Sequence, residues 1–94
     1  LKLRLLYNIL IELSIERDHN YMKEFPSRLK ALRKEFGLKQ TEMAADVGLS
    51  PSGFQCYEQG KGLPDVPRLY QLAEYFGVSI DYLLGRTEKR EINQ

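Results

Sequence analysis

Five glycines divide the chain after residue 22 into short segments, and this division restricts the possible fold more than any other feature. Each glycine directly follows a segment with helix-like spacing of apolar residues: Gly37, Gly48, Gly60, Gly77 and Gly85. Glycine adopts the left-handed conformation that ends many helices at little cost. We therefore expect five short helices, near residues 23–36, 40–47, 51–58, 66–76 and 80–84.

The residues before three of these segments are good helix starts. Ser50, Asp65 and Ser79 carry side-chain oxygens that can accept a hydrogen bond from the first helical turn. Pro51 would fill the first helical position after Ser50, where a proline is tolerated. Two apolar stripes at helical intervals then predict the core: Phe25, Leu29, Leu32 and Phe36, and Leu69, Leu72, Ala73 and Phe76. Ile80, Leu83 and Leu84 would close its base. No segment after Met22 has the pattern of a strand, so this part is predicted to be all-α.

Size and charge permit one small domain with an uneven surface. Ninety-four residues suit a single domain, and the net charge is only +1. Residues 22–40 nevertheless carry six bases and two acids, whereas residues 41–94 carry five bases and eight acids. One end could attract phosphate. A solvated helix face explains the same imbalance, so charge alone does not identify a nucleic-acid partner.

Several classes of site lack the residues they need. Cys56 is the only cysteine and His19 the only histidine, so the sequence predicts neither a disulfide framework nor a His/Cys metal site. A reducing cytoplasm is the simplest compartment. The longest apolar run is Ile9–Ile11, too short for a transmembrane helix or a signal-peptide core. With no catalytic constellation and no phosphate-cradling glycine loop, we expect no enzyme, no cofactor, no metal and no small-molecule ligand.

The stretch Gln40–Gln59 has the pattern of two short helices that are joined by a tight turn at Gly48 and cross at a steep angle. The residues expected to face inward are apolar or small: Met43, Ala44, Val47, Leu49, Phe54 and Tyr57. The solvent face of the second helix would then carry Pro51, Ser52, Gln55, Cys56 and Gln59. A helix that exposes short polar groups near its N-terminus can enter the major groove of DNA.

The stretch Phe25–Thr87 resembles the lambda-repressor/Cro type of helix-turn-helix domain, also called the XRE family. The matching segments are Arg28–Arg33, Leu38–Ala44, Tyr57–Lys61 and Leu72–Leu84. The resemblance covers about two-thirds of the chain, and its small-residue, glycine and core positions all keep register. It implies an all-α, five-helix DNA-binding domain over residues 22–85, with residues 1–21 as an extension and residues 86–94 as a charged tail.

The resemblance also implies roles for single residues. Gln40 matches a phosphate-contacting glutamine that can also brace the recognition helix, and Arg33 and Glu58 match an ion pair between the first and third helices of the domain. Ser52, Gln55 and Cys56 match readers of base edges or of the nearby backbone, and Lys30, Lys39 and Lys61 match phosphate contacts. Ser50, Gly53 and Gln59 complete the predicted DNA-binding face. Each of these residues could instead be plain surface.

Two residues depart from the family pattern. Gly53 lies inside the predicted recognition helix, where it costs about 1 kcal/mol of helix stability relative to Ala. It either permits close approach to DNA or is simply tolerated. Cys56 replaces a longer polar side chain, which predicts weaker hydrogen-bonded readout, and a small packed residue is a simpler interpretation than a redox sensor.

Residues 1–21 lie outside the resemblance. Apolar residues occupy every odd position from Leu1 to Ile15, which favours a strand. A helix competes, because Leu3, Leu6, Leu10 and Leu13 share a helical face. The segment would need to pair with a second copy, as a dimerising ribbon, or to lie on the helical domain. Another interpretation is that residues 1–21 are translated upstream sequence and that Met22 is the start.

The sequence thus predicts a transcription regulator of bacterial or phage type that acts in the cytoplasm at the nucleoid. We expect a homodimer on a palindromic operator of double-stranded DNA, acting as a repressor. The charged tail is too short for an effector domain, which argues against ligand control within this chain. The alternative is a protein-interaction module, such as an antitoxin-like partner, that keeps the fold without specific DNA binding; near-neutral charge, Gly53 and Cys56 favour it.

Overall fold

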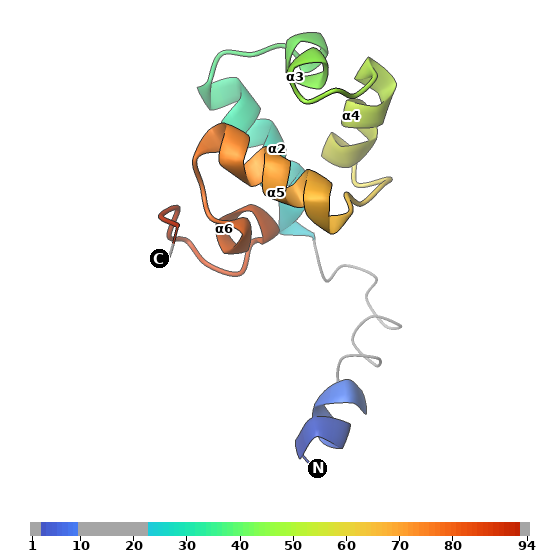
Figure 1. The fold of residues 1–94 in the computed structure, drawn as a ribbon, viewed down its shortest axis with the longest axis vertical. Helices are drawn as coiled ribbons and strands as arrows, with labels where there is room; N and C mark the ends of the chain where they lie inside the picture. The colour runs from blue at the N-terminus through green and yellow to red at the C-terminus, as the bar shows by residue number, and fades with distance from the viewer. Residues whose placement is uncertain (1–2, 10–22, 93–94) are drawn as a thin grey trace.

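A computed structural model describes residues 3–9 and 23–92, and the second of these ranges folds into a bundle of short helices (Figure 1). The helices are α2 (Glu24–Glu35), α3 (Gln40–Asp46), α4 (Pro51–Glu58), α5 (Val66–Phe76) and α6 (Ile80–Leu84). All five agree with the predicted helices to within one residue at either end. The described residues contain no strand, so the predicted all-α class is confirmed.

The local signals for helix ends act as predicted. Ser50, Asp65 and Ser79 each accept a hydrogen bond from the backbone N–H three residues later, at 3.0, 2.9 and 3.0 Å. The five glycines that follow the predicted helices all have positive φ angles, between 68° and 83°. Neighbouring residues therefore determine the starts of α4, α5 and α6 and the ends of the five helices.

The core lies where all five helices meet. Seven of its larger side chains are almost completely inaccessible to solvent: Phe25, Leu29, Leu32, Met43, Phe54, Leu72 and Leu83. Helix α2 contacts α4 on one side and α6 on the other, and α3 packs against α4 (Figure 1). Because α2 contacts both α4 and α6, it forms the scaffold on which the α3–α4 pair is held.

Phe36 does not belong to this core, contrary to the prediction. It follows the last residue of α2 and is 49% exposed. Its ring lies nearly perpendicular to the Phe76 ring, with the centroids 5.1 Å apart. The apolar stripe on α2 runs past the edge of the core, because the chain turns away toward α3 directly after this position.

The strand favoured near the N-terminus is wrong for residues 3–9, which are helical. A lone strand leaves its backbone N–H and C=O groups unpaired, whereas a helix pairs them internally. The helical alternative therefore holds over these residues, and a dimerising strand ribbon does not. Residues 10–15 also belong to the alternating pattern of the predicted strand and to the helical alternative, and they lie outside the described residues.

The charged segment after α6 is attached to the bundle. Arg28 of α2 donates hydrogen bonds to the carbonyl oxygens of Tyr82 and Thr87, at 2.8 and 2.7 Å. The Arg90 carbonyl oxygen accepts from the backbone N–H of Ser79 at 2.8 Å. Residues 86–92 thus return along α2, and the domain boundary placed at residue 85 stays a prediction.

Candidate nucleic-acid interface

The α3–α4 pair is joined by a four-residue turn with little conformational choice. Gly48 has a φ of 75°, a value that a side-chain-bearing residue would adopt only with strain. The Leu49 N–H then donates to the Ala44 carbonyl oxygen at 2.8 Å, which closes the end of α3. Ala44 is completely buried. Because its side chain is so small, α4 can pack closely across α3.

One face of α4 is anchored in the domain. Phe54 is completely buried, and half-buried Tyr57 lies edge-on to the ring of Phe25, with the centroids 6.2 Å apart. These two aromatic side chains point inward from positions three residues apart on the helix. Their packing determines which side of α4 remains outside.

The opposite face of α4 is polar and accessible. Pro51, Ser52, Gln55 and Gln59 are exposed, as is the capping residue Ser50. The hydroxyl oxygens of Ser50 and Ser52 lie 3.3 Å apart, so the amino end of α4 presents a pair of interacting hydroxyls. In Figure 1, α4 lies at the periphery of the bundle, beyond α2 and α5.

Gly53 and Cys56 are only partly exposed. A Cβ atom at Gly53 would lie 3.1 Å from the Ser50 hydroxyl, so a side chain there would crowd the capping oxygen. The Cβ of Cys56 lies 3.8 Å from the position that a Cβ on Gly62 would take. The loop after α4 therefore packs beside Cys56 and leaves it less accessible than Gln55.

A buried polar network holds the carboxyl end of α4. Glu58 accepts from Arg33 Nε at 2.6 Å and from Arg33 Nη2 at 3.1 Å. Gln40 Nε2, at the start of α3, donates to the same carboxylate at 2.9 Å. The side chains of Arg33 and Glu58 are only 10% and 3% exposed. One carboxylate therefore links α2, α3 and α4.

The third guanidinium nitrogen of Arg33 also has a hydrogen-bond partner. Its Nη1 donates to the Leu38 carbonyl oxygen at 2.7 Å, in the turn between α2 and α3. No buried side-chain nitrogen or oxygen among the described residues lacks a partner. The network can therefore tolerate burial, because each charged group keeps hydrogen bonds that replace those to water.

The three candidate phosphate-binding lysines are all exposed, on different elements. Lys39 directly precedes α3, and Lys61 lies in the loop that follows α4. Lys30 is one helical turn from both Pro26 and Arg33 on α2. Pro26 lies 3.5 Å from where a Cβ on Gly60 would be, and Arg33 contacts Glu58, so Lys30 is on the side of α2 nearest α4.

The sequence analysis missed a second set of contacts, which attaches the end of α3 to α5. Arg68 and Gln71 of α5 both donate to the carbonyl oxygen of Val47, the residue that directly follows α3. The Tyr75 hydroxyl donates to Asp46 Oδ2 at 2.7 Å. This hydrogen bond, together with partial burial, raises the pKa of Tyr75 above its usual 10.0. The positions 68, 71 and 75 share one face of α5, and that polar stripe was the available signal.

Other kinds of site find no support in the part of the chain that the structure describes. Residues 3–9 and 23–92 contain no group of three His, Cys, Asp or Glu side chains placed to hold a metal ion. Within the same residues, no helix has the length and apolar character needed to cross a membrane.

Comparison with known proteins matches the helical bundle to helix-turn-helix proteins. A family model described as a helix-turn-helix domain matches residues 27–89. The cryptic phage CTXphi transcriptional repressor RstR of Vibrio cholerae is 39% identical over 59 residues, which cover 63% of this chain and 53% of that protein. The SPbeta prophage-derived HTH-type transcriptional regulator YonR of Bacillus subtilis is 41% identical over 63 residues, 67% of this chain and 58% of its own.

The regulator ImmR of Bacillus subtilis gives a similar result. It is 34% identical over 67 residues, which are 71% of this chain and 53% of ImmR. This chain therefore matches between about half and three-fifths of the length of each of these relatives.

Proposed function

Because this chain belongs to the helix-turn-helix domain family, of the lambda-repressor and Cro type, we propose that it regulates transcription by binding specific sequences in duplex DNA. Helix α4 is the element that reads the major groove. The observation that carries this proposal is the two-sided character of α4: Phe54 is fully buried while Ser52 and Gln55 are exposed. A recognition helix needs a rigid inner face and a polar outer face.

Base readout is assigned to the middle and amino end of α4. The Gln55 side chain carries both a donor and an acceptor, which suit the N7 and N6 positions of adenine. The Ser52 hydroxyl can contact a base edge or the adjacent backbone. Cys56 is partly covered, so its contribution to readout is the smallest of the three.

Backbone contacts are assigned to residues that surround α4. Lys30, Lys39 and Lys61 are exposed on three elements near α3 and α4, where their ammonium groups can neutralise phosphates. Gln40 is half-buried and already bonded to Glu58, so its proposed role is to hold α4 while its remaining edge faces the backbone.

We further propose that the protein acts as a dimer on a palindromic operator and represses the adjacent gene. Two copies of α4 would enter successive major grooves, about 34 Å apart. Repression is supported by the relative RstR, which is named as a repressor. Such a regulator of bacterial or prophage genes would work at the nucleoid, in the cytoplasm.

Selection from a random duplex library, followed by a salt titration on the selected sequence, tests the proposal. The expected result is one enriched palindromic motif whose affinity falls steeply as the salt concentration rises. If no motif is enriched and duplex affinity stays weak at low salt, the chain instead fits the protein-interaction alternative, which shares the fold but does not read DNA.

A further inference from the structure

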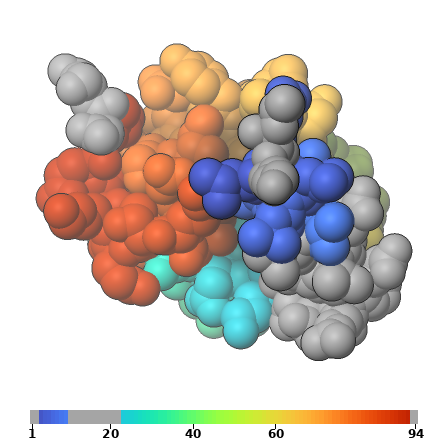
Figure 2. All heavy atoms as spheres, turned by 90° about the horizontal axis from the view of Figure 1, so that it is seen from below, coloured from blue at the N-terminus to red at the C-terminus, as the bar shows by residue number. Residues whose placement is uncertain are grey.

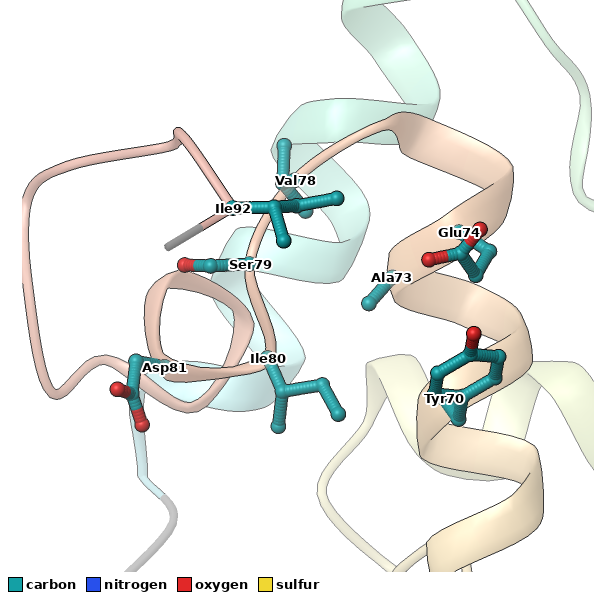
Figure 3. Close-up of a pocket in the computed structure, with 8 residues that line it drawn as sticks. All are labelled: Tyr70, Ala73, Glu74, Val78, Ser79, Ile80, Asp81 and Ile92. Carbon is teal, nitrogen blue, oxygen red and sulfur yellow. The ribbon is translucent and has the colours of Figure 1, made fainter. Parts of the chain in front are cut away.

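Helix α5 has one side that faces α6 and another that reaches α3. Figure 2, a view from the end of the bundle opposite α3, shows α5 and α6 side by side. Figure 3 shows Tyr70 and Ala73 along the α6 side, beside a hollow of about 240 Å³. At about 100° per residue, the stripe formed by Arg68, Gln71 and Tyr75 lies across the helix from those two residues. The stripe therefore turns away from α6 and makes its hydrogen bonds to the end of α3.

One carbonyl oxygen at the carboxyl end of α3 loses its usual donor. In a continued helix, the N–H four residues after Val47 would donate to the Val47 carbonyl oxygen, but that residue is Pro51, which has no N–H. The last turn of α3 also contains no base, although the negative end of a helix dipole favours one, and it includes the acid Asp46. A donor and a positive charge are therefore both needed from another part of the chain.

Arg68 and Gln71 supply what the end of α3 lacks. Arg68 Nη1 donates to the Val47 carbonyl oxygen, and Gln71 Nε2 donates to the same atom at 3.3 Å. The side-chain oxygen of Gln71 accepts from Arg68 Nη1 at 2.7 Å, which holds the guanidinium in place. Arg68 therefore brings a donor and a positive charge together, and it caps α3 from a different helix.

Side chains from two other helices thus hold α3 at its two ends. At its start, Gln40 donates to the carboxylate of Glu58 on α4 at 2.9 Å. Directly after its last residue, Val47 accepts from Arg68 of α5. A single attachment would let α3 swing about that point, whereas two attachments fix its direction. Because only the four residues 47–50 join α3 to α4, the direction of α3 also limits that of the amino end of α4.

We propose that Arg68 is a positioning residue for DNA readout, which acts through the Val47 carbonyl oxygen and not by touching DNA. This role rests on the proposed function and deepens it, because it names the α5 residue that holds the turn before α4. Arg68 lies outside the apolar core, so its loss releases the end of α3 without removing a core side chain. Hydrogen bonds to base edges weaken steeply when their geometry changes, whereas flexible lysine side chains can still follow a phosphate.

The ratio of specific to non-specific affinity separates positioning from general destabilisation. Arg68→Met keeps most of the aliphatic stem and removes the donors. It should weaken binding to the selected operator by at least about tenfold, the size of one lost base contact, and binding to a scrambled duplex by less than about twofold. Partial unfolding lowers both affinities by the same factor, so it cannot change the ratio. Arg68→Lys, which keeps the charge and a donor, should recover part of the lost discrimination.

Arg86→Met is the matched control. It removes an equal charge from a side chain that is 75% exposed and follows α6, and it should leave both affinities within about twofold of the wild type. A direct phosphate contact by Arg68 would instead weaken both duplexes alike and reduce the salt slope by about one. Either that result or an unchanged affinity ratio in Arg68→Met would overturn the positioning role.

Amide hydrogen exchange without DNA tests the cap itself. The Leu49 N–H, which donates to the Ala44 carbonyl oxygen at 2.8 Å, should exchange at least about tenfold faster in Arg68→Met than in the wild type. The Leu83 N–H, which donates to Ser79 in α6, should change much less. Equal acceleration of both amides, or none, would overturn the cap. A wild type without operator preference would contradict the proposed function itself, whereas the exchange result would still show whether Arg68 holds the turn.

Discussion

The guanidinium of Arg33 on α2 donates two hydrogen bonds to the carboxylate of Glu58 on α4, and both side chains are at least nine-tenths buried. This contact attaches the proposed recognition helix to the scaffold helix. The cost of removing water from both charges offsets much of their attraction, so the intact pair need not add stability. Its importance lies in what happens when one partner is lost.

Arg33→Met should lower the free energy of unfolding by about 3–5 kcal/mol, because Glu58 would remain buried without its counter-ion. Adding Glu58→Met should restore a large part of that loss. Urea denaturation followed by circular dichroism measures both. Lys34→Met, at an exposed base on the same helix, is the control and should cost less than about 0.5 kcal/mol. A loss below about 1 kcal/mol for Arg33→Met would mean that the pair does not hold α4.

The hydroxyl of Ser50 accepts from the Gly53 N–H, so Ser50→Ala should destabilise the domain by about 1 kcal/mol. Gly53→Ala should gain helix stability but crowd that hydroxyl, since the new Cβ would lie 3.1 Å from it. The gain should therefore be larger, up to about 1 kcal/mol, when Ser50 is already Ala. A double-mutant cycle in denaturant measures the coupling, and strictly additive effects would contradict the crowding.

Arg28 should contribute far more to stability than its partner Glu88. The Arg28 side chain is 13% exposed and donates to two backbone carbonyl oxygens, whereas the Glu88 side chain is 91% exposed. Arg28→Met should cost about 2 kcal/mol or more, because those carbonyls lose a charged donor. Glu88→Gln should cost less than about 1 kcal/mol. Thermal and chemical unfolding check this, and similar losses for both variants would show that the segment after α6 is not held by Arg28.

The ion pair between Glu35 and Arg90 should give a pH-dependent contribution. The hydrogen bond from Arg90 lowers the pKa of Glu35 below its ordinary 4.5. A carboxyl group with a lowered pKa stabilises the folded state above pH 4.5, and this contribution disappears as the pH falls through the folded-state value. The stability difference between wild type and Glu35→Gln should therefore be constant near neutrality and shrink below pH 4.5.

Unfolding midpoints of the wild type and of Glu35→Gln, measured from pH 7 to pH 3, test this predicted pH dependence. Glu91→Gln is a suitable control, because Glu91 forms no ion pair among the described residues. A wild-type advantage that grew in acid would reverse the predicted sign and exclude the Glu35–Arg90 contact as its source.

Element boundaries could be predicted because their causes are local. Ser50 and Gly48 act on the residues next to them, so the sequence alone located the carboxyl end of α3 and the start of α4 to within one residue. The inward position of Phe54 followed from helical spacing for the same reason. The buried contact of Arg33 with Glu58 was accessible only through resemblance, since the two residues are 25 apart and no spacing rule joins them.

The predictions that were wrong and the contacts that were missed all depend on residues distant in the sequence. Phe36 continues a helical stripe, but whether it is buried depends on what covers the end of α2. Residues 3–9 fit two periodic patterns, and the described residues contain no strand with which they could pair, so the helical pattern prevails. The links from Arg68 to Val47 and from Arg28 to Thr87 connect side chains to backbone carbonyls. Every residue has such a carbonyl, so composition and spacing cannot indicate which one is used.

The most direct test compares Gln55→Ala with Lys30→Ala on the selected operator and on a panel with each base pair changed in turn, at several salt concentrations. Gln55→Ala should remove about 1–3 kcal/mol of discrimination at one base position and leave the salt dependence unchanged. Lys30→Ala should weaken all sequences about equally and reduce the salt slope by about one. If the two variants behave alike, or if Gln55→Ala leaves base preference intact, the outer face of α4 does not read DNA.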